Sequence, residues 1–312
     1  MSDRNYMDLA PIVLFVFNRP WHTKQTIETL QQNILASESD LVVFSDGPKT
    51  ASDEPKVKEV RDYIRAIDGF KKLSIIERDR NFGLAESIIA GVTEVVNKYG
   101  KIIVLEDDLI TSPYFLSYMN HSLRKYEDAA KVMHVSGYVL PIDSTGLKET
   151  FFYRASSCWG WGTWARAWKH FEYDINELIP RFDDESKVLF NIDGKYTFWG
   201  QMESQRDGKI NSWAIRWYAS VFLNNGVCLH PSKSMTNNIG FDGSGIHCNE
   251  DDIYNVQIHD REIIEFEELC EENRDALERI KSFLATTERP LHTRTFSLLR
   301  RKLAGFSKRE KD

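Results

Sequence analysis

The sequence lacks several features that would assign its chemistry directly. Its four cysteines are widely spaced and form no Cys-x-x-Cys pair, so neither a zinc knuckle nor a thioredoxin-type site is indicated. No apolar run approaches the ~20 residues that a membrane-spanning helix needs. No Gly-x-Gly-x-x-Gly follows the first apolar stretch and no Gly-x₄-Gly-Lys-Ser/Thr occurs, which argues against a dinucleotide fingerprint and a P-loop. Four thiols without a signal peptide predict a reducing, cytoplasmic compartment.

Positive charge is scarce over most of the chain and gathers at its end. The 312 residues carry a formal net charge of -7, which argues against a nucleic-acid partner. Residues 289–312 contain eight Lys and Arg against two Asp and Glu, a net +6 that leaves -13 for the remainder. We expect this tail to be either a solvated terminus or a peripheral contact with the inner face of the cell membrane.

Apolar stretches alternate with helical patterns through the first 136 residues. The sequence predicts strands at 11–17, 40–45, 73–76, 102–105 and 132–135, and it predicts that those at 11–17 and 102–105 are buried. It predicts helices at 21–33, 55–67 and 84–99, and another that starts at Ser112-Pro113. This alternation predicts a doubly wound α/β sheet with right-handed crossovers. Beyond residue 136 we expect a helix, a strand at 227–229 and a glycine-rich loop within 210–247, then a charged helix over 260–287.

Polar side chains follow four consecutive predicted strands. They are Arg19, Asp46, Arg80-Asn81 and Glu106-Asp107-Asp108. The carboxyl ends of parallel strands meet at one edge of an open sheet, where ligands bind. Adjacent carboxylates repel one another unless a cation or water separates them, and a divalent cation carrying a diphosphate would suit the place. Each residue taken alone also fits ordinary turn chemistry, so the prediction depends on the four together.

Several of these stretches are similar to known glycosyltransferases of the GT-A type. Pro-Ile-Val-Leu-Phe-Val-Phe-Asn-Arg-Pro (11–20) resembles the first strand and loop of the N-acetylglucosaminyltransferase I type. Val104 to Leu109, followed by Ser112 to Tyr118, resembles the metal motif and next helix of that group. Arg80-Asn81-x-Gly83 resembles the broader family-2 sugar transferases of bacteria, and the whole chain resembles bacterial sugar transferases of polysaccharide loci.

This resemblance implies a GT-A (Rossmann-like) fold, with a mostly parallel sheet flanked by helices and an acceptor-side lobe. It implies one domain over residues 1–260, with a nucleotide-sugar half at about 8–136 and an acceptor half at about 137–260. A C-terminal helix and the basic tail would occupy 261–312.

The resemblance also assigns roles to single residues around the donor. Asp108 would bind Mn²⁺ or Mg²⁺ directly, and Glu106 and Asp107 would face the ribose and the sugar. Asp46 would contact the uracil. Arg19 would contact the nucleotide, and Asn81 would lie in the donor site beside it.

A tryptophan-rich middle segment allows two interpretations. Aromatic faces stack on sugar rings, but they also pack against a sheet. Trp161 and Trp213 are candidates for the donor site. Trp164 and Trp168, whose spacing is helical, are predicted to be core, and core packing is also open for Trp213 and Trp217.

The catalytic base is the part of the resemblance that fails. Ala214 stands where the N-acetylglucosaminyltransferase I type has the aspartate that acts as base in an inverting displacement. The remaining candidates, which the sequence does not rank, are Asp242, Asp207, Glu203 and Asp184. The glycine-rich stretch 237–248 resembles a loop that orders over the donor, and His247 within it is a candidate second metal ligand.

The residues together with this resemblance imply a metal-dependent, inverting glycosyltransferase of surface polysaccharide synthesis. It would move a hexosyl or N-acetylhexosaminyl group from a UDP-sugar to a saccharide or lipid-linked saccharide. A sugar nucleotidyltransferase is one alternative, but Asn18-Arg19-Pro20-Trp21 is not the glycine-rich loop that such an enzyme needs. A non-catalytic relative that binds saccharide or nucleotide is the other alternative, and it is consistent with Ala214.

Overall fold

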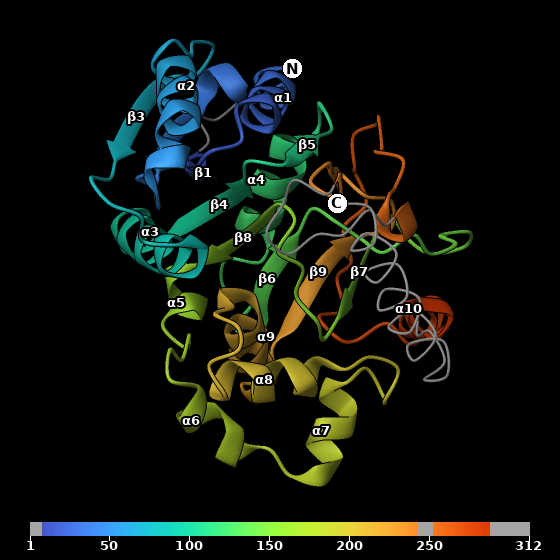
Figure 1. The fold of residues 1–312 in the computed structure, drawn as a ribbon. Coiled ribbons are helices and arrows are strands. Elements are labelled where there is room, and N and C mark those ends of the chain that lie inside the picture. The colour runs from blue at the N-terminus through green and yellow to red at the C-terminus, as the bar shows by residue number, and fades with distance from the viewer. Residues whose placement is uncertain (1–7, 243–251, 288–312) are drawn as a thin grey trace, which may run out of the picture.

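The computed structural model describes residues 8–242 and 252–287. An eight-stranded sheet has the order β3-β2-β1-β4-β8-β6-β9-β7 (Figure 1). Its first four strands, all parallel, are β1 (Ile12–Val16), β2 (Asp40–Ser45), β3 (Lys72–Glu77) and β4 (Lys101–Glu106). The others are β6 (Val132–Ser136), β7 (Thr150–Tyr153), β8 (Trp161–Trp164) and β9 (Val227–Pro231). β7 and β8 run antiparallel to their neighbours, and the other six strands run parallel to one another. The sheet is therefore mostly parallel.

Helices cover both faces of this sheet. The long ones are α1 (Pro20–Gln31), α2 (Glu54–Arg65), α3 (Leu84–Tyr99), α4 (Phe115–Lys125), α9 (Trp213–Leu223) and α10 (Arg274–Thr287). The short ones are α5 (Ala165–Trp168), α6 (Ile175–Leu178), α7 (Asp184–Phe190) and α8 (Phe198–Arg206). Successive residues of β8 point to the two layers, since Trp161 packs against Trp213 of α9, whereas a Cβ at Gly162 would lie 3.4 Å from Leu123 of α4. The α/β prediction is therefore confirmed.

The strands of the first half formed where apolar runs predicted them. Residues 12–15 of β1 and residues 102–105 of β4 are almost fully excluded from solvent, as expected of strands covered on both faces. β1 ends at Val16, and Pro20 opens α1, because proline suits the first helical turn, where the backbone N–H has no partner to lose. The helix expected from Ser112-Pro113 begins two residues later, at Phe115.

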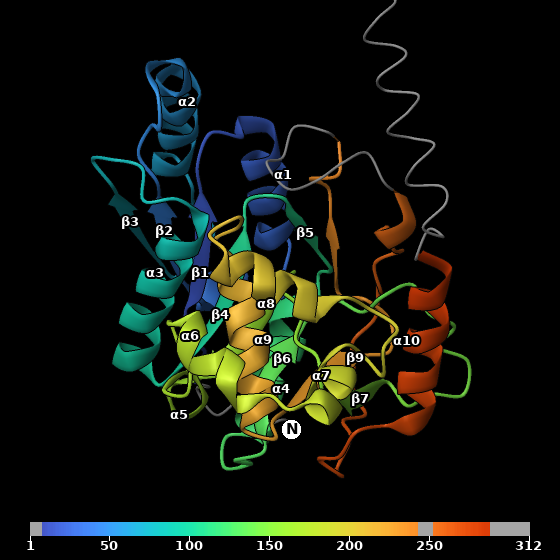
Figure 2. The same cartoon turned by 60° about the horizontal axis from the view of Figure 1, so that its bottom comes forward.

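One expectation for the second half was wrong, and two of its strands were missed. The charged helix predicted over 260–287 begins only at Arg274, because the preceding segment runs alongside β7. There Glu149 accepts the backbone N–H groups of Ile264 and Glu265, which a helix would need for itself. Strands β7 and β8 were not predicted at all. Figure 2 shows α8 and α9 in front of the sheet, with α10 at its β7 side.

Two short strands join the halves beside the sheet. β5 (Leu109–Thr111) pairs antiparallel with β10 (Thr236–Asn238), so that residues more than 120 positions apart lie side by side. Four 3₁₀ turns, at Ala36–Glu38, Ala51–Asp53, Ile179–Arg181 and Asp252–Tyr254, complete the described elements. Among the helices of the two described ranges, none has the length and hydropathy of a membrane span.

Candidate functional site

The carboxyl ends of the four parallel strands lie at one edge of the sheet. The register pairs Val16 of β1 with Ser45 of β2, and Ser45 with Glu77 of β3. On the other side of β1, Phe15 pairs with Glu106 of β4. The polar residues that follow these strands are therefore brought to a common edge, as the sequence predicted.

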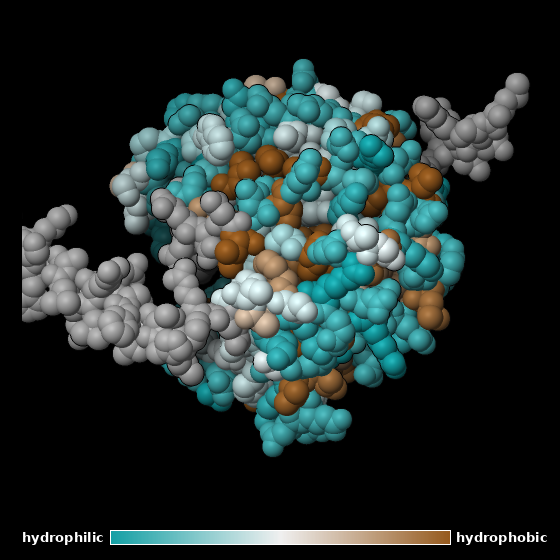
Figure 3. Space-filling model, turned by 90° about the vertical axis from the view of Figure 1, so that its right-hand side faces the viewer, coloured by the Kyte–Doolittle hydropathy of each residue, from teal (hydrophilic) through white to brown (hydrophobic). Residues whose placement is uncertain are grey.

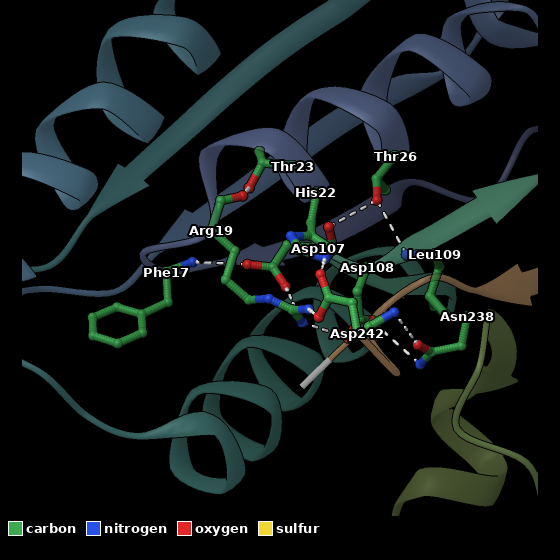
Figure 4. A network of polar contacts seen from close by, with 11 residues as sticks. Phe17, Arg19, His22, Thr23, Thr26, Asp107, Asp108, Leu109, Asn238 and Asp242 are labelled. Atoms are coloured by element: carbon green, nitrogen blue, oxygen red, sulfur yellow. Dashed lines mark hydrogen bonds and ion pairs between the residues drawn. The ribbon is translucent and has the colours of Figure 1, made fainter. Parts of the chain in front are cut away.

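An ion-pair cluster lies at the centre of this edge (Figure 4). The Arg19 guanidinium, at the start of α1, lies 2.7 Å from Asp108 Oδ2 and 3.9 Å from Asp107 Oδ1. Both aspartates are 9% exposed, so solvent screens these contacts little. Arg19 and the two aspartates meet because β1 and β4 are adjacent parallel strands, so the segments that follow them leave the sheet at the same edge.

Thr26 of α1 fixes the turn that carries the two aspartates. Its hydroxyl donates to the backbone carbonyl of Asp107 and accepts the backbone N–H of Leu109, at 2.9 and 3.1 Å. The backbone N–H of Phe17 donates to Asp107 Oδ2 at 3.4 Å. Asp107 and Asp108 thus lie on a turn held by hydrogen bonds from neighbouring elements.

Three consecutive carboxylates, Glu106, Asp107 and Asp108, form an acidic turn at this edge. Burial, followed by the charge of Asp108, raises the pKa of Asp107 to about 7. Burial and the charges of both aspartates raise the pKa of Glu106 well above its ordinary value, and Arg19 only partly offsets this. A further positive charge would therefore be stabilised here.

The loop after β10 covers the acidic turn. The backbone N–H of Ile239 donates to the carbonyl of Asp108 at 2.9 Å. Gly240 is so close that a Cβ at its position would lie 2.3 Å from Asp108 Oδ2, which leaves no space for a side chain. Asp242 follows, with its Oδ2 3.0 Å from His22 Nε2 and its Oδ1 3.7 Å from Arg19 Nη2.

The side-chain oxygens of the acidic turn are of the type that Mg²⁺ and Mn²⁺ prefer as ligands. Asp107 and Asp108 offer hard oxygen ligands, and Arg19 is the cation that contacts both of them. In residues 8–242 and 252–287, no three His, Cys, Asp or Glu side chains are assembled as a metal site. These cations commonly take only one or two carboxylates and complete their shell with phosphates and water. The residues therefore fit a metal that arrives with a phosphate ligand. His247 lies outside the described residues.

Asp46 organises the neighbouring loop. Its carboxylate accepts the backbone N–H groups of Gly47, Phe82 and Gly83 at 2.9 to 3.1 Å. Asn81 donates from Nδ2 to the carbonyl of Gly47 at 2.9 Å, which joins the ends of β2 and β3. A contact of Asp46 with uracil and a donor contact of Asn81 stay predictions.

The tryptophans form an aromatic core. Trp161 is fully buried in β8, and its ring stacks on Trp213 at 5.0 Å between centroids. Trp164 and Trp168 are buried as predicted, but Trp164 ends β8, so the helical spacing inferred for the pair is wrong. Trp161 has no accessible surface for a donor to contact, so its assignment to the donor site is wrong, whereas Trp213 also borders a cavity.

Of the candidate bases, Asp242 alone has a described contact with Arg19, the residue that also contacts Asp107 and Asp108. Asp207 is held by Lys209 and Arg206, and their hydrogen bonds lower its pKa, which makes it a weaker base. Glu203 is exposed on α8, and Asp184 opens α7, where it pairs with Lys187.

Sequence reasoning missed His22 and the aromatic wall beyond Asp242. His22 lies three residues after Arg19 on α1, so helical spacing alone would have placed the two on one face. Phe241 contacts Trp159, with ring centroids 5.4 Å apart, and Trp159 contacts Tyr254 at 6.2 Å. No local motif predicts this cluster, because its members come from three distant segments.

Comparisons with known proteins give weak similarities. No protein-family model matches the sequence, and no curated protein matches it. Among solved structures, the mannosyltransferase PcManGT from Pyrobaculum calidifontis, in complex with GDP-Man and Mn²⁺, is 12% identical with a TM-score of 0.36, over 70% of this chain and 72% of that one. S. aureus TarS is 14% identical with a TM-score of 0.30, over 45% of this chain and 24% of that one.

A structure of residues 1–349 of S. aureus TarS is 11% identical, with a TM-score of 0.41, over 72% of this chain and 59% of that one. At these TM-scores the similarities assign no activity. The chemistry of the site must therefore be inferred from its own residues.

Proposed function

We propose that this chain is a metal-dependent glycosyltransferase that uses a nucleotide-sugar, with a UDP-sugar as donor and inversion at the anomeric carbon. The observation that carries the proposal is the cluster of Arg19, Asp107 and Asp108 at the carboxyl ends of parallel strands, beneath a loop that brings Asp242 to the same place. This combination suits a diphosphate and its cation.

Each residue of the proposed site would have a separate role in binding the donor. Asp108, with Asp107 beside it, would hold Mn²⁺ or Mg²⁺, which neutralises the diphosphate and stabilises the leaving nucleotide when bound. Arg19 would exchange its contact with Asp108 for a donor phosphate oxygen. Asp46 and Asn81 would shape the pocket for the base through the loops they join.

Asp242 is the proposed general base. An inverting displacement needs a group that accepts the proton of the acceptor hydroxyl on the face opposite the nucleotide. Asp242 is 44% exposed at its side chain, so an incoming hydroxyl can reach it, and His22 positions it from the buried side. Burial and the charge of Arg19 lower the pKa of His22, which leaves the imidazole neutral near pH 7.

The wider setting of the enzyme rests on the resemblance. We propose a single catalytic domain over residues 1–260, followed by a C-terminal helix and a basic tail, in the cytoplasm or at the inner face of the cell membrane. The acceptor would be a saccharide or a lipid-linked saccharide in surface polysaccharide synthesis, and the transferred group a hexose or N-acetylhexosamine.

Donor hydrolysis tests the proposal. Purified protein is incubated with a panel of UDP-sugars and Mn²⁺, and released UDP is measured with and without a chelator. We expect slow release from one donor that stops when the metal is chelated. No release from any donor, together with no calorimetric binding of UDP, would overturn the proposal.

A non-catalytic relative is the second candidate function. Ala214 supports it, because no carboxylate lies where the resemblance has its base. Such a protein would bind UDP with metal and release none from any donor, so the same two measurements separate it from the enzyme.

A further inference from the structure

The loop between β3 and α3 presents an aromatic ring at the edge where the four parallel strands end. Phe82 lies in this loop and is 42% exposed. Exposure alone does not mark a site, because single apolar side chains are common on protein surfaces. Figure 3 shows such side chains among hydrophilic ones on the side of the molecule where β7 and α10 lie, away from β3. What distinguishes Phe82 is that its position is fixed by several contacts.

Asp46 holds the backbone of this loop. It follows β2 directly and is buried. One carboxylate oxygen accepts the N–H groups of Gly47 and Phe82, and the other accepts those of Phe82 and Gly83, at 2.9 to 3.1 Å. A carboxylate has about four lone-pair positions, so all of them are already used. A nucleobase could therefore bind Asp46 directly only by displacing one of these N–H groups.

Arg78 supports the ring itself. Its guanidinium carbon lies 4.2 Å from the ring centroid of Phe82 and 5.4 Å from that of Phe44, which is a cation–π arrangement with both rings. Arg78 is buried, and it donates to the hydroxyl and the carbonyl of Ser87 on α3. The ring of Phe82 therefore rests on a buried cation that is itself held by a helix.

The loop after β2 packs tightly against the loop after β3. A Cβ at Gly47 would lie 2.6 Å from the backbone of Arg80, which leaves no space for a side chain. Asn81 joins the same two loops through its hydrogen bond to the carbonyl of Gly47. The guanidinium of Arg80 also lies 5.4 Å from the Phe82 ring, but Arg80 is exposed, and exposed side chains change rotamer rapidly. A ligand can therefore take its place on the ring.

A fixed and exposed ring of this kind suits a flat aromatic ligand. Every nucleobase has a π face, and stacking on an aromatic side chain stabilises binding without hydrogen bonds to the edges of the base. Because the ring is already held in place, little conformational entropy is lost when a base stacks on it. Only β1 separates β2 from β4, so the ends of β2 and β4 are about 10 Å apart. One extended nucleotide can therefore place its base at this loop and its diphosphate at the acidic turn.

We propose that Phe82 is the stacking platform for the nucleobase of the donor, and that Asp46 is a positioning residue that acts through Phe82. The inference rests on the proposed function, which makes a nucleotide the ligand of this edge. It differs from a direct contact of Asp46 with uracil, because the base is held by the face of a ring and not by hydrogen bonds to the carboxylate.

A nucleotide with a non-aromatic base tests the stacking. 5,6-Dihydro-UDP keeps the N3–H and both carbonyl groups of UDP, but its base is puckered and has no aromatic face. In calorimetry with Mn²⁺, the original protein should bind UDP about tenfold more tightly than dihydro-UDP. In Phe82→Ala the affinity for UDP should fall about tenfold and the preference for UDP should disappear. Equal affinity of the original protein for the two nucleotides would overturn the proposal.

Further measurements separate stacking from a structural role of the ring. Phe82→Tyr keeps an aromatic face and should keep the preference for UDP. Pyrophosphate with Mn²⁺ is a ligand without a base, and it should bind the original protein and Phe82→Ala equally. The matched control is Tyr99→Ala, which removes an exposed aromatic ring at the other end of α3 and should bind UDP like the original protein. Loss of pyrophosphate binding in Phe82→Ala would contradict the proposal.

A second variant covers the case in which Phe82→Ala does not fold. Phe82→Leu keeps most of the volume of the side chain and removes its aromatic face, so it should lose the preference for UDP in the same way. A folded Phe82→Leu protein that still prefers UDP over dihydro-UDP would contradict the stacking role.

A double-mutant cycle tests the role of Asp46. Asp46→Asn replaces an acceptor oxygen by a donor group, which should loosen the loop and lower the affinity for UDP about fivefold or more. If Asp46 acts through the ring, the same change in the Phe82→Ala protein should lower the affinity no further. Additive losses would overturn the positioning role.

The failure of this inference is distinguishable from that of the proposed function. UDP binding by the original protein that Phe82→Ala leaves unchanged would overturn the stacking role alone. An original protein that binds neither UDP nor pyrophosphate with Mn²⁺ would overturn the proposed function, and the inference with it.

Discussion

The acidic edge of the first half and the aromatic cavity of the second half, which has a volume of about 340 Å³ and is bordered by α9 and α10, are built from opposite chemistry. At the edge, Arg19, Asp107 and Asp108 are close together and the aspartates are buried, and this burial with the charge of Asp108 raises the pKa of Asp107 to about 7. In the cavity, aromatic rings pack against one another, and the hydroxyls of Tyr138 and Tyr218 donate to backbone carbonyls. The edge therefore holds unbalanced charge that a ligand can neutralise, whereas the cavity offers apolar surface that a ligand can cover. The two regions should respond differently to the same kinds of perturbation.

The largest expected effect is at the acidic edge. Asp108→Ala should reduce the affinity for UDP in the presence of Mn²⁺ at least about a hundredfold, because it removes the proposed direct metal ligand. Calorimetry with and without Mn²⁺ measures this effect. The control Asp62→Ala changes an exposed carboxylate of α2 and should bind UDP normally. Unaltered metal-dependent affinity in Asp108→Ala would remove this residue from the site.

The aromatic half should respond in stability rather than in nucleotide binding. Trp217 is fully buried, and its indole N–H donates to His134 Nδ1 at 3.1 Å. Trp217→Ala should lower the free energy of unfolding by about 3–5 kcal/mol, measured by urea denaturation. Trp21→Ala, at a 58% exposed position, should change it by less than about 0.5 kcal/mol. A similar small change in both variants would contradict the core assignment.

Asp242 tests the link between the two regions. Asp242→Ala should lower turnover about a hundredfold or more, as loss of a general base does, while UDP affinity changes little. Steady-state kinetics with the identified donor and acceptor provide the measurement. Asp207→Ala is the matched control, since its carboxylate is paired with Arg206 and Lys209. Equal turnover in the two variants would contradict the assignment of Asp242 as the general base.

The smallest expected effects are opposite pH dependences of stability in the two regions. The pKa of Asp107 is raised to about 7, so its contribution to stability is present below its unfolded pKa and is lost as pH rises through about 7. His230 borders the aromatic cavity, and burial lowers its pKa to about 4, so its cost to stability appears as pH falls from about 6.5 to 4. Asp107→Asn and His230→Gln should therefore shift the pH profile of the melting temperature in opposite directions. Parallel shifts would contradict these pKa directions.

The sequence predicted the first half well because its signals are local. The strands near 12–16 and 102–105 are uninterrupted apolar runs, and Pro20 marks a helix start by its own geometry. The sequence predicted that Arg19, Asp46 and the acidic turn share one edge of the sheet, because the carboxyl ends of parallel strands lie at the same edge. The 260–273 segment was mispredicted because its backbone N–H groups donate to Glu149, just before β7, and to Phe152 of β7, both more than 100 residues away.

By itself, the sequence determined which residues carry charge, where apolar runs become strands, and that consecutive strand ends share an edge. These properties depend on neighbours in the chain. The pairing of His22 with Asp242, the closeness of Gly240 to Asp108 and the aromatic cavity were decided only by the tertiary structure. Each joins segments that contact one another only after the sheet has formed, and no spacing along the chain encodes such a distance.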